Sequence, residues 1–120
     1  MSLPEAETLV RHALETEKFG IISEIDIQAK LKEKLGVGHP PHKILGACNP
    51  KLVYQALQDN PDVALALPCN VVLREEHGKT FVSAILPSVA LRPFEGDRVR
   101  ETAAKAEEAL ARVFATLAAS

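Results

Sequence analysis

The chain has 120 residues, 47% of them apolar and 25% charged, with a net charge of −2, four phenylalanines, one tyrosine and no tryptophan. This length fits a single domain over residues 1–120 with a soluble globular composition. The slight acidity and few aromatic rings argue against nucleic-acid binding, which normally uses a basic surface or stacked aromatic side chains. No apolar run approaches the roughly 20 residues that span a bilayer, and the acidic N-terminus is unlike a secretory signal, so we expect a cytoplasmic protein with no membrane partner.

The first third of the chain predicts a helix, a strand and a second helix. Pro4 and the glutamates after it favour a helix that begins near Ser2, and residues 19–25 (FGIISEI) have the composition of a strand. Asp26 follows as the N-cap of the second helix. The buried edge of that helix should consist of three residues at helical spacing, Ile27, Leu31 and Leu35.

The middle of the chain predicts two strands around a short helix. A strand from about His42 to Cys48 leads into Asn49 and Pro50, which form a typical N-cap and first-turn pair. The longest extended run then reaches from Val63 to Arg74 (VALALPCNVVLR), and its alternation divides the side chains between the two faces of a sheet. The core face should carry Leu65, Leu67, Cys69, Val71 and Leu73.

The last third predicts a hairpin and a long helix. His77-Gly78 is a tight turn into a fourth strand over residues 79–86, and Asp97 is the expected cap of the final helix. The order of elements predicts an α+β fold, with one four-stranded mixed sheet and helices on one face. The other face would expose the apolar residues Ala64, Ala66, Pro68 and Val72, so we expect a homodimer or a bound ligand to cover it.

Two Cys-Asn dipeptides, Cys48-Asn49 and Cys69-Asn70, are the most informative local feature, and they contain the only cysteines. Cys48 precedes a helix start, where free N–H groups can lower a thiol pKa and favour a nucleophile or a metal ligand. The alternative for Cys48 is a small buried hydrophobe, and the alternation around Cys69 favours that core role for it. Asn70 is polar within an apolar strand, so it either satisfies a bulge or contacts something external.

These residues define one candidate site. If the strands before and after the third helix are parallel neighbours, Cys48 and Cys69 lie together at the sheet end where open α/β sheets bind ligands. His42 and His39 flank Pro40-Pro41. The two side chains could bind a metal together with a cysteine, although such prolines more often stiffen a turn. We predict no metal and no cofactor, and the ligand-binding candidates are Cys48, Asn49, Cys69, Asn70 and His42.

Three segments together carry a family resemblance: FGIISEIDIQAKLKEKLGV, KILGACNPKLVYQAL and LALPCNVVLREEHGKTFVSAI. They resemble the bacterial and archaeal family called domain of unknown function 302, most specifically in GACNP and LPCN. The resemblance implies a small α+β domain with a curved, mostly antiparallel sheet, similar in architecture to the TATA-binding-protein-like fold. That likeness concerns architecture and implies neither DNA binding nor any other activity.

Two functional hypotheses remain. The first is a non-enzymatic domain, dimeric in solution, that binds a small ligand or a partner protein; it agrees with the lack of a complete catalytic motif. The second is a redox or metal-binding thiol site at Cys48 and Cys69. The reactivity of the two thiols in the folded protein distinguishes these hypotheses.

Overall fold

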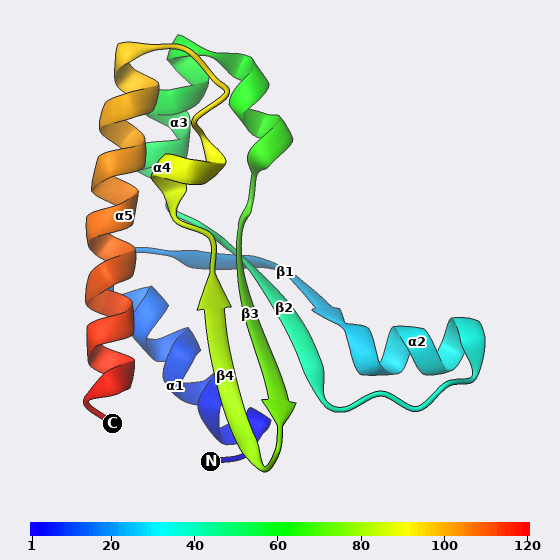
Figure 1. Cartoon of the computed structure of the whole chain (residues 1–120). Coiled ribbons are helices and arrows are strands. Elements are labelled where there is room, and N and C mark those ends of the chain that lie inside the picture. The colour runs from blue at the N-terminus through cyan, green and yellow to red at the C-terminus, as the bar shows by residue number, and fades with distance from the viewer.

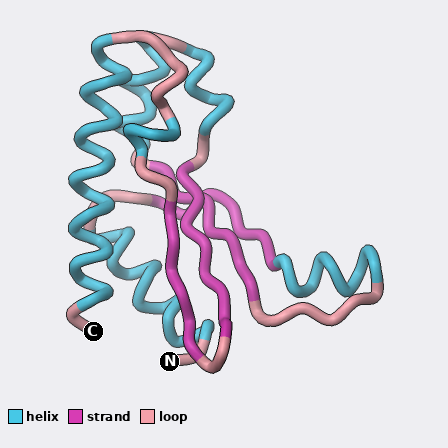
Figure 2. The backbone as a smooth tube through the Cα atoms, in the orientation of Figure 1, coloured by secondary structure: helices cyan, strands magenta, loops and turns pink.

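The computed structural model describes all 120 residues and contains one sheet, five α-helices and one 3₁₀ helix (Figures 1 and 2). In chain order the elements are α1 (Leu3–Thr16), β1 (Gly20–Asp26), α2 (Ile27–Leu35), β2 (His42–Cys48), α3 (Pro50–Asp59), the 3₁₀ helix η1 (Pro61–Ala66), β3 (Cys69–Glu76), β4 (Lys79–Ala84), α4 (Pro87–Ala90) and α5 (Asp97–Ala118). The α+β class and the eight predicted elements are confirmed, while η1 and α4 were not predicted. None of the helices is long and apolar enough to cross a bilayer.

The four strands form an antiparallel sheet in the order β1-β2-β3-β4. The parallel pairing of β2 and β3 on which the site hypothesis depended is therefore wrong, and the mostly antiparallel sheet that the family resemblance implied is confirmed. A parallel pair needs a connection that travels back along the whole sheet. Here α3 and η1 stay at the end where β2 leaves the sheet, so the chain re-enters at that same end (Figure 1).

The predicted strand from Val63 to Arg74 begins later than expected. Residues 61–66 form η1, and β3 starts at Cys69. The side chain of Asn60 accepts a hydrogen bond from the backbone N–H of Asp62 at 3.0 Å, which favours a helical turn at this point. Because a 3₁₀ helix has three residues per turn, Val63 is completely buried while Leu65 is 83% exposed. Leu65 therefore does not belong to the core face.

Two clusters of buried side chains form the core. The larger cluster lies between the sheet and the helices α1 and α5, and Leu14, Leu45 and Leu73 at its centre are fully buried. The smaller cluster lies at the end of the sheet among α3, η1 and the start of α5, and includes Val63 and Val99. Helix α5 contributes to both clusters, because its first half packs in the smaller one and its second half in the larger one.

A network of four charged side chains ties α1 to the first two strands. Nζ of Lys43 lies 2.9 Å from Oε1 of Glu7 and 2.8 Å from Oε1 of Glu24. The guanidinium of Arg11 reaches the same two carboxylates at 2.8 and 2.7 Å. A hydrogen bond from Lys43 lowers the pKa of Glu24. Burial alone would raise the pKa of Glu7, but hydrogen bonds from Lys43 and Arg11 lower it overall.

Helix α2 differs from the prediction in its packing. Its ends agree with expectation: the backbone N–H of Ala29 donates to Asp26 Oδ1 at 2.9 Å, and Gly36 ends the helix with φ +67°. However, α2 has no buried residue, and Leu35 is 69% exposed. The helix connects two neighbouring antiparallel strands and projects away from α1 and α5 (Figure 1), so neither face of its own sheet lies beneath it.

The start of α5 is capped by another helix. Asp97, the predicted cap, is the first helical residue, and the cap position belongs to Gly96. Oδ2 of Asp59, the last residue of α3, accepts hydrogen bonds from the backbone N–H groups of Arg98 (2.9 Å) and Val99 (3.3 Å). A Cβ atom on Gly96 would lie 2.1 Å from that oxygen, so a glycine is needed at this position.

Candidate functional site

An apolar pocket of about 160 Å³ lies at the end of the sheet where β2 leaves and β3 begins. Thirteen of its eighteen lining residues are hydrophobic, and none is charged. Ala47 and Phe19 belong to the larger core cluster, whereas Val63 and Leu91 belong to the smaller one. The pocket therefore lies between the two halves of the core, with α3, η1 and α4 around it.

Three of the four Cys-Asn residues line this pocket: Asn49, Cys69 and Asn70. The antiparallel register explains why they meet. It pairs Ala47 with Cys69 and Gly46 with Asn70, which places the last residues of β2 beside the first residues of β3. The two motifs are thus neighbours. They meet because β2 and β3 are antiparallel, whereas the site hypothesis assumed parallel strands.

The two cysteines lie on opposite faces of the sheet. Cys69 pairs with Ala47 and packs against the larger core cluster, and because side chains alternate along a strand, Cys48 points to the other face. Both thiols are free, and Cys48 does not line the pocket. Burial raises the pKa of both Cys48 and Cys69, so the expected lowering of the Cys48 pKa by the start of α3 is not found.

Three neutral polar side chains reach the pocket. Asn49 is the predicted N-cap of α3, since its Oδ1 accepts from the backbone N–H of Leu52 at 3.4 Å; its amide N–H₂ makes no hydrogen bond within the chain. Asn70 is exposed, and its side chain has no partner in the chain. Thr102 of α5 is only 5% exposed and lines the pocket; its hydroxyl makes no hydrogen bond in the chain but stays accessible, since no fully buried side-chain polar atom lacks a partner.

Thr102 is the functional candidate that sequence reasoning missed. It falls within the apolar stripe of the final helix, on the same side as Val99 and Ala103. A hydroxyl in such a stripe usually donates to the carbonyl four residues earlier, as Thr8 and Thr16 do in α1. That Thr102 is buried without this bond could be known only from the structure.

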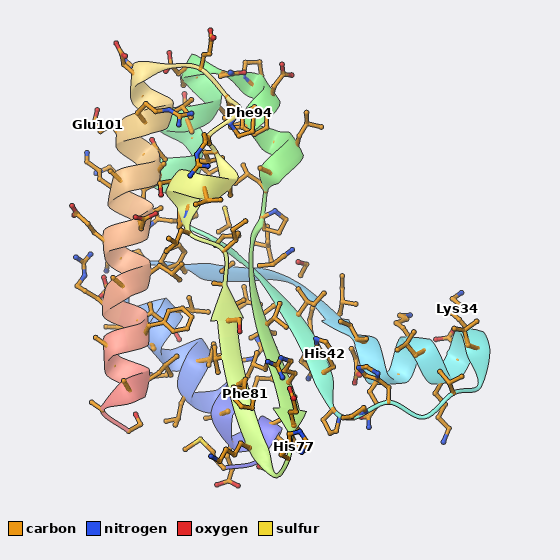
Figure 3. The ribbon with its side chains drawn as sticks, viewed as in Figure 1. Lys34, His42, His77, Phe81, Phe94 and Glu101 are labelled. Carbon is orange, nitrogen blue, oxygen red and sulfur yellow. The ribbon has the colours of Figure 1, made fainter.

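His42 lies at the other end of the sheet from the pocket. It is the first residue of β2, whereas Cys48 is the last, which separates them by about 20 Å along the strand. Figure 3 shows His42 near the turn that carries His77. The His42 ring stacks on His39, with Nδ1 of His42 3.1 Å from Nε2 of His39. Burial, followed by the charges of His39 and Arg74, lowers the pKa of His42.

The structure therefore divides the five candidate residues. Asn49, Cys69 and Asn70 line one pocket, Cys48 lies next to it on the opposite sheet face, and His42 is remote. No three histidine, cysteine, aspartate or glutamate side chains converge as a metal-binding set. The pocket can hold an uncharged organic molecule and offer it hydrogen bonds from two amides and a hydroxyl.

Comparisons with known proteins agree with this architecture. None of the curated proteins matches the chain. A crystal structure described as an uncharacterized conserved protein DUF302 from Bacillus stearothermophilus has a TM-score of 0.88 and 28% sequence identity, over 97% of this chain and 91% of that chain. The family profile described as Domain of unknown function DUF302 matches residues 1–117. The chain therefore belongs to the DUF302 family, as its two Cys-Asn motifs indicated.

Proposed function

We propose that this protein is a small non-enzymatic binding domain, and that its pocket takes up a neutral organic molecule about the size of one aromatic ring. The pocket lined by Asn49, Cys69 and Asn70 is the observation that carries the proposal. Its volume of about 160 Å³ matches engineered apolar cavities of about 150 Å³, which bind benzene. The absence of a charged lining residue favours a neutral ligand, because a buried ion would lose its hydration without gaining a partner.

The polar groups at the pocket indicate what the ligand carries. The hydroxyl of Thr102 and the amides of Asn49 and Asn70 are free to donate, and a hydroxyl or carbonyl group on the ligand would accept from them. Phenols and small aromatic amides have this combination of an apolar ring and one polar group.

We propose in addition that the protein acts as a homodimer. The face of the sheet opposite α1 and α5 has no helix on it. It carries the exposed Ile25 and Phe81 and the half-buried Ile44 and Val72, beside the polar His42 and Arg74. An exposed apolar face of this kind is typical of an interface between proteins.

A thiol-based redox or metal site is the alternative function. Cys69 lines the pocket, which favours thiol chemistry there, but Cys48 lies on the other sheet face. No histidine lines the pocket to act as a base, and burial raises the pKa of both thiols. These features favour binding over thiol chemistry.

Native mass spectrometry of freshly purified, unreduced protein is the first test. Added mass on the folded chain would identify a ligand that copurifies, in agreement with the proposal. A loss of two hydrogens would reveal a disulfide between Cys48 and Cys69, and this result would favour the thiol site over the binding domain. If the chain is reduced and carries no added mass, we would next titrate it with phenol, benzamide and benzoate. Concentrations up to about 10 mM are needed, because ligands of this size bind weakly.

The titration is followed by the amide NMR signals of the chain. Phenol and benzamide should shift the signals of Cys69 and Thr102, and benzoate should bind more weakly because its charge has no partner. Ala106→Phe, which fills the pocket, should abolish binding, while Ala104→Phe on the exposed side of the same helix should not. The pocket proposal is overturned if no probe shifts these signals, or if A106F binds phenol as the wild type does.

Two conservative variants separate the polar roles. Thr102→Val keeps the shape of the side chain and removes its hydroxyl, so phenol should bind several-fold more weakly. Asn49→Asp keeps the oxygen that caps α3 and removes the amide N–H₂. We expect N49D to retain stability but to weaken the binding of benzamide, whereas Asn49→Ala should lose about 1 kcal/mol of stability as well.

A further inference from the structure

A second cavity lies beside the apolar pocket. It is an open cleft of about 820 Å³ between the end of α1, the start of α3 and the middle of α5, and Figure 1 shows α3 and α5 side by side there. Only two of its twelve lining residues are hydrophobic. The cleft is therefore as polar as the pocket is apolar.

The pocket and the cleft share part of their walls. Asn49 and Leu52 line both of them. Elsewhere the wall passes from one cavity to the other between consecutive residues. In Lys18-Phe19 and in Lys105-Ala106, the lysine lines the cleft and the apolar residue lines the pocket. Single side chains therefore separate the two cavities, and a flexible chain of a few bonds can span that wall.

The cleft is positively charged. Four of its lining side chains are basic and two are acidic: Lys18, Lys51, Lys105, Arg112, Glu17 and Glu108. Two of the basic side chains already have acidic partners. Nε of Arg112 lies 2.8 Å from Oε1 of Glu17, and Nζ of Lys105 lies 2.9 Å from Oε1 of Glu101. The remaining two basic side chains decide what the cleft can bind.

Lys18 and Lys51 form no ion pair within the chain. Lys18 also has a φ of +70°, a conformation that glycine adopts at lower cost at the end of a helix. A lysine at this position therefore indicates a use for its charge. In a chain whose net charge is −2, two unpaired lysines at one cleft favour an anionic ligand there.

We infer that the cleft binds the anionic end of the molecule whose ring occupies the pocket, so that the ligand is an arylalkanoic acid, an apolar ring joined to a carboxylate by a short chain. This inference rests on the proposed function and adds a charged group, outside the pocket, to the neutral group inside it. The uncharged pocket disfavours a carboxylate, whereas Lys18 and Lys51 attract one into the cleft. Asn49 lies at the boundary, where its free amide N–H₂ can donate to the carboxylate.

Two series of probes test the inference by NMR titration. The first consists of benzoate, phenylacetate, 3-phenylpropionate and 4-phenylbutyrate, and the second of the amide of each acid. The two members of a pair share the ring and the methylene groups, so the ratio of their dissociation constants measures the effect of the charge. Benzamide should bind more tightly than benzoate, because the carboxylate of benzoate stays in the pocket.

The order should reverse as the chain lengthens. At low salt, 4-phenylbutyrate should bind about fivefold more tightly than its amide, since two exposed cations each contribute modestly. Sodium chloride at about 0.5 M should remove most of this preference, because the lysines are exposed to solvent. The chain length at which the order reverses measures how far the lysines lie from the ring.

Neutral variants identify the cations. Lys18→Gln and Lys51→Gln should each reduce the preference for 4-phenylbutyrate over its amide about twofold, and the double variant should abolish it. Lys34→Gln removes the same charge from α2, which Figure 3 shows far from Glu101 and α5, and should leave the preference unchanged. All of these variants should bind phenol as the wild type does, because no charged residue lines the pocket.

The outcomes separate the cleft from the pocket. The inference about the cleft alone is overturned if phenol and the amides bind but no acid binds more tightly than its amide. It is also overturned if K34Q reduces the preference as much as the double variant. If neither phenol nor any amide shifts the signals of Cys69 and Thr102, the pocket proposal is overturned together with it.

Discussion

Helices α1 and α2 begin with similar local signals and end in opposite surroundings. Ser2 caps α1 by a capping box with Glu5, and Asp26 caps α2 through the N–H of Ala29. Five residues of α1 are buried, but none of α2. Caps and spacing thus determine that each segment is helical, whereas burial depends on a partner surface that only α1 finds within the chain.

Truncation of one leucine in each helix should give the largest difference. Leu14 of α1 is fully buried, and Leu14→Ala should lower the free energy of unfolding by about 3 kcal/mol through lost burial and the cavity left behind. Leu35→Ala should change it by less than about 0.5 kcal/mol in dilute solution. Urea denaturation measures both. Equal losses at low protein concentration would show that Leu35 has a partner within its own chain.

Charge pairs extend the comparison. Lys43→Met should cost about 1–2 kcal/mol, because Glu7 is mostly buried and would lose one of its two cationic partners. Lys30→Met in α2 removes an exposed pair with Glu33 and should cost less than about 0.5 kcal/mol. Unfolding curves at low and high salt check both values. A Lys43→Met variant as stable as the wild type would contradict a structural role for the network.

Removing the N-cap of α1 should lower global stability, whereas removing the N-cap of α2 should affect only that helix. Ser2→Ala should lower global stability by about 1 kcal/mol, because α1 is part of the main core. Asp26→Ala should leave global stability nearly unchanged and instead speed hydrogen exchange in α2 about fivefold, because α2 can fray alone. Exchange rates across both helices make the comparison. A global loss in D26A equal to that in S2A would mean that α2 is coupled to the core.

The pH dependence of stability that arises from His42, at the start of β2, should be the smallest effect. The pKa of His42 is lowered in the folded state, so the unfolded chain takes up a proton first and stability falls as the pH drops from about 7 through the ordinary histidine pKa near 6.5. The lowered pKa values of Glu7 and Glu24 act only below about pH 4.5. His42→Asn should flatten the curve between pH 7 and 5.5. An unchanged curve in H42N would rule out this role.

Local sequence signals were enough to predict where the elements lie. The bounds of β2, the turn at His77-Gly78 and the caps at Asp26 and Asn49 all depend on neighbours a few residues away. The features that were not predicted depend on distant parts of the chain. Asp59 caps a helix 38 residues later, and the direction of β3 follows from where α3 and η1 pack.

The candidate site shows the same division. Asn70 was identified because it is polar within an apolar strand, and Asn49 because it follows Cys48 as the expected cap of a helix; both line one pocket. His42 was included because it lies close in sequence, but a strand of seven residues carries it to the opposite end of the sheet. Thr102 could not be found in this way, because only the packing of α5 reveals that its hydroxyl lacks a partner.

The position of the pocket between the two core clusters has a consequence for how the molecule unfolds. Helix α5 is the one helix with buried side chains in both clusters, so this helix couples them. The end of the molecule that holds α3, η1 and α4 should therefore open as a separate cooperative unit, ahead of the sheet. A molecule seated in the pocket would contact both clusters at once and merge the two steps into a single transition.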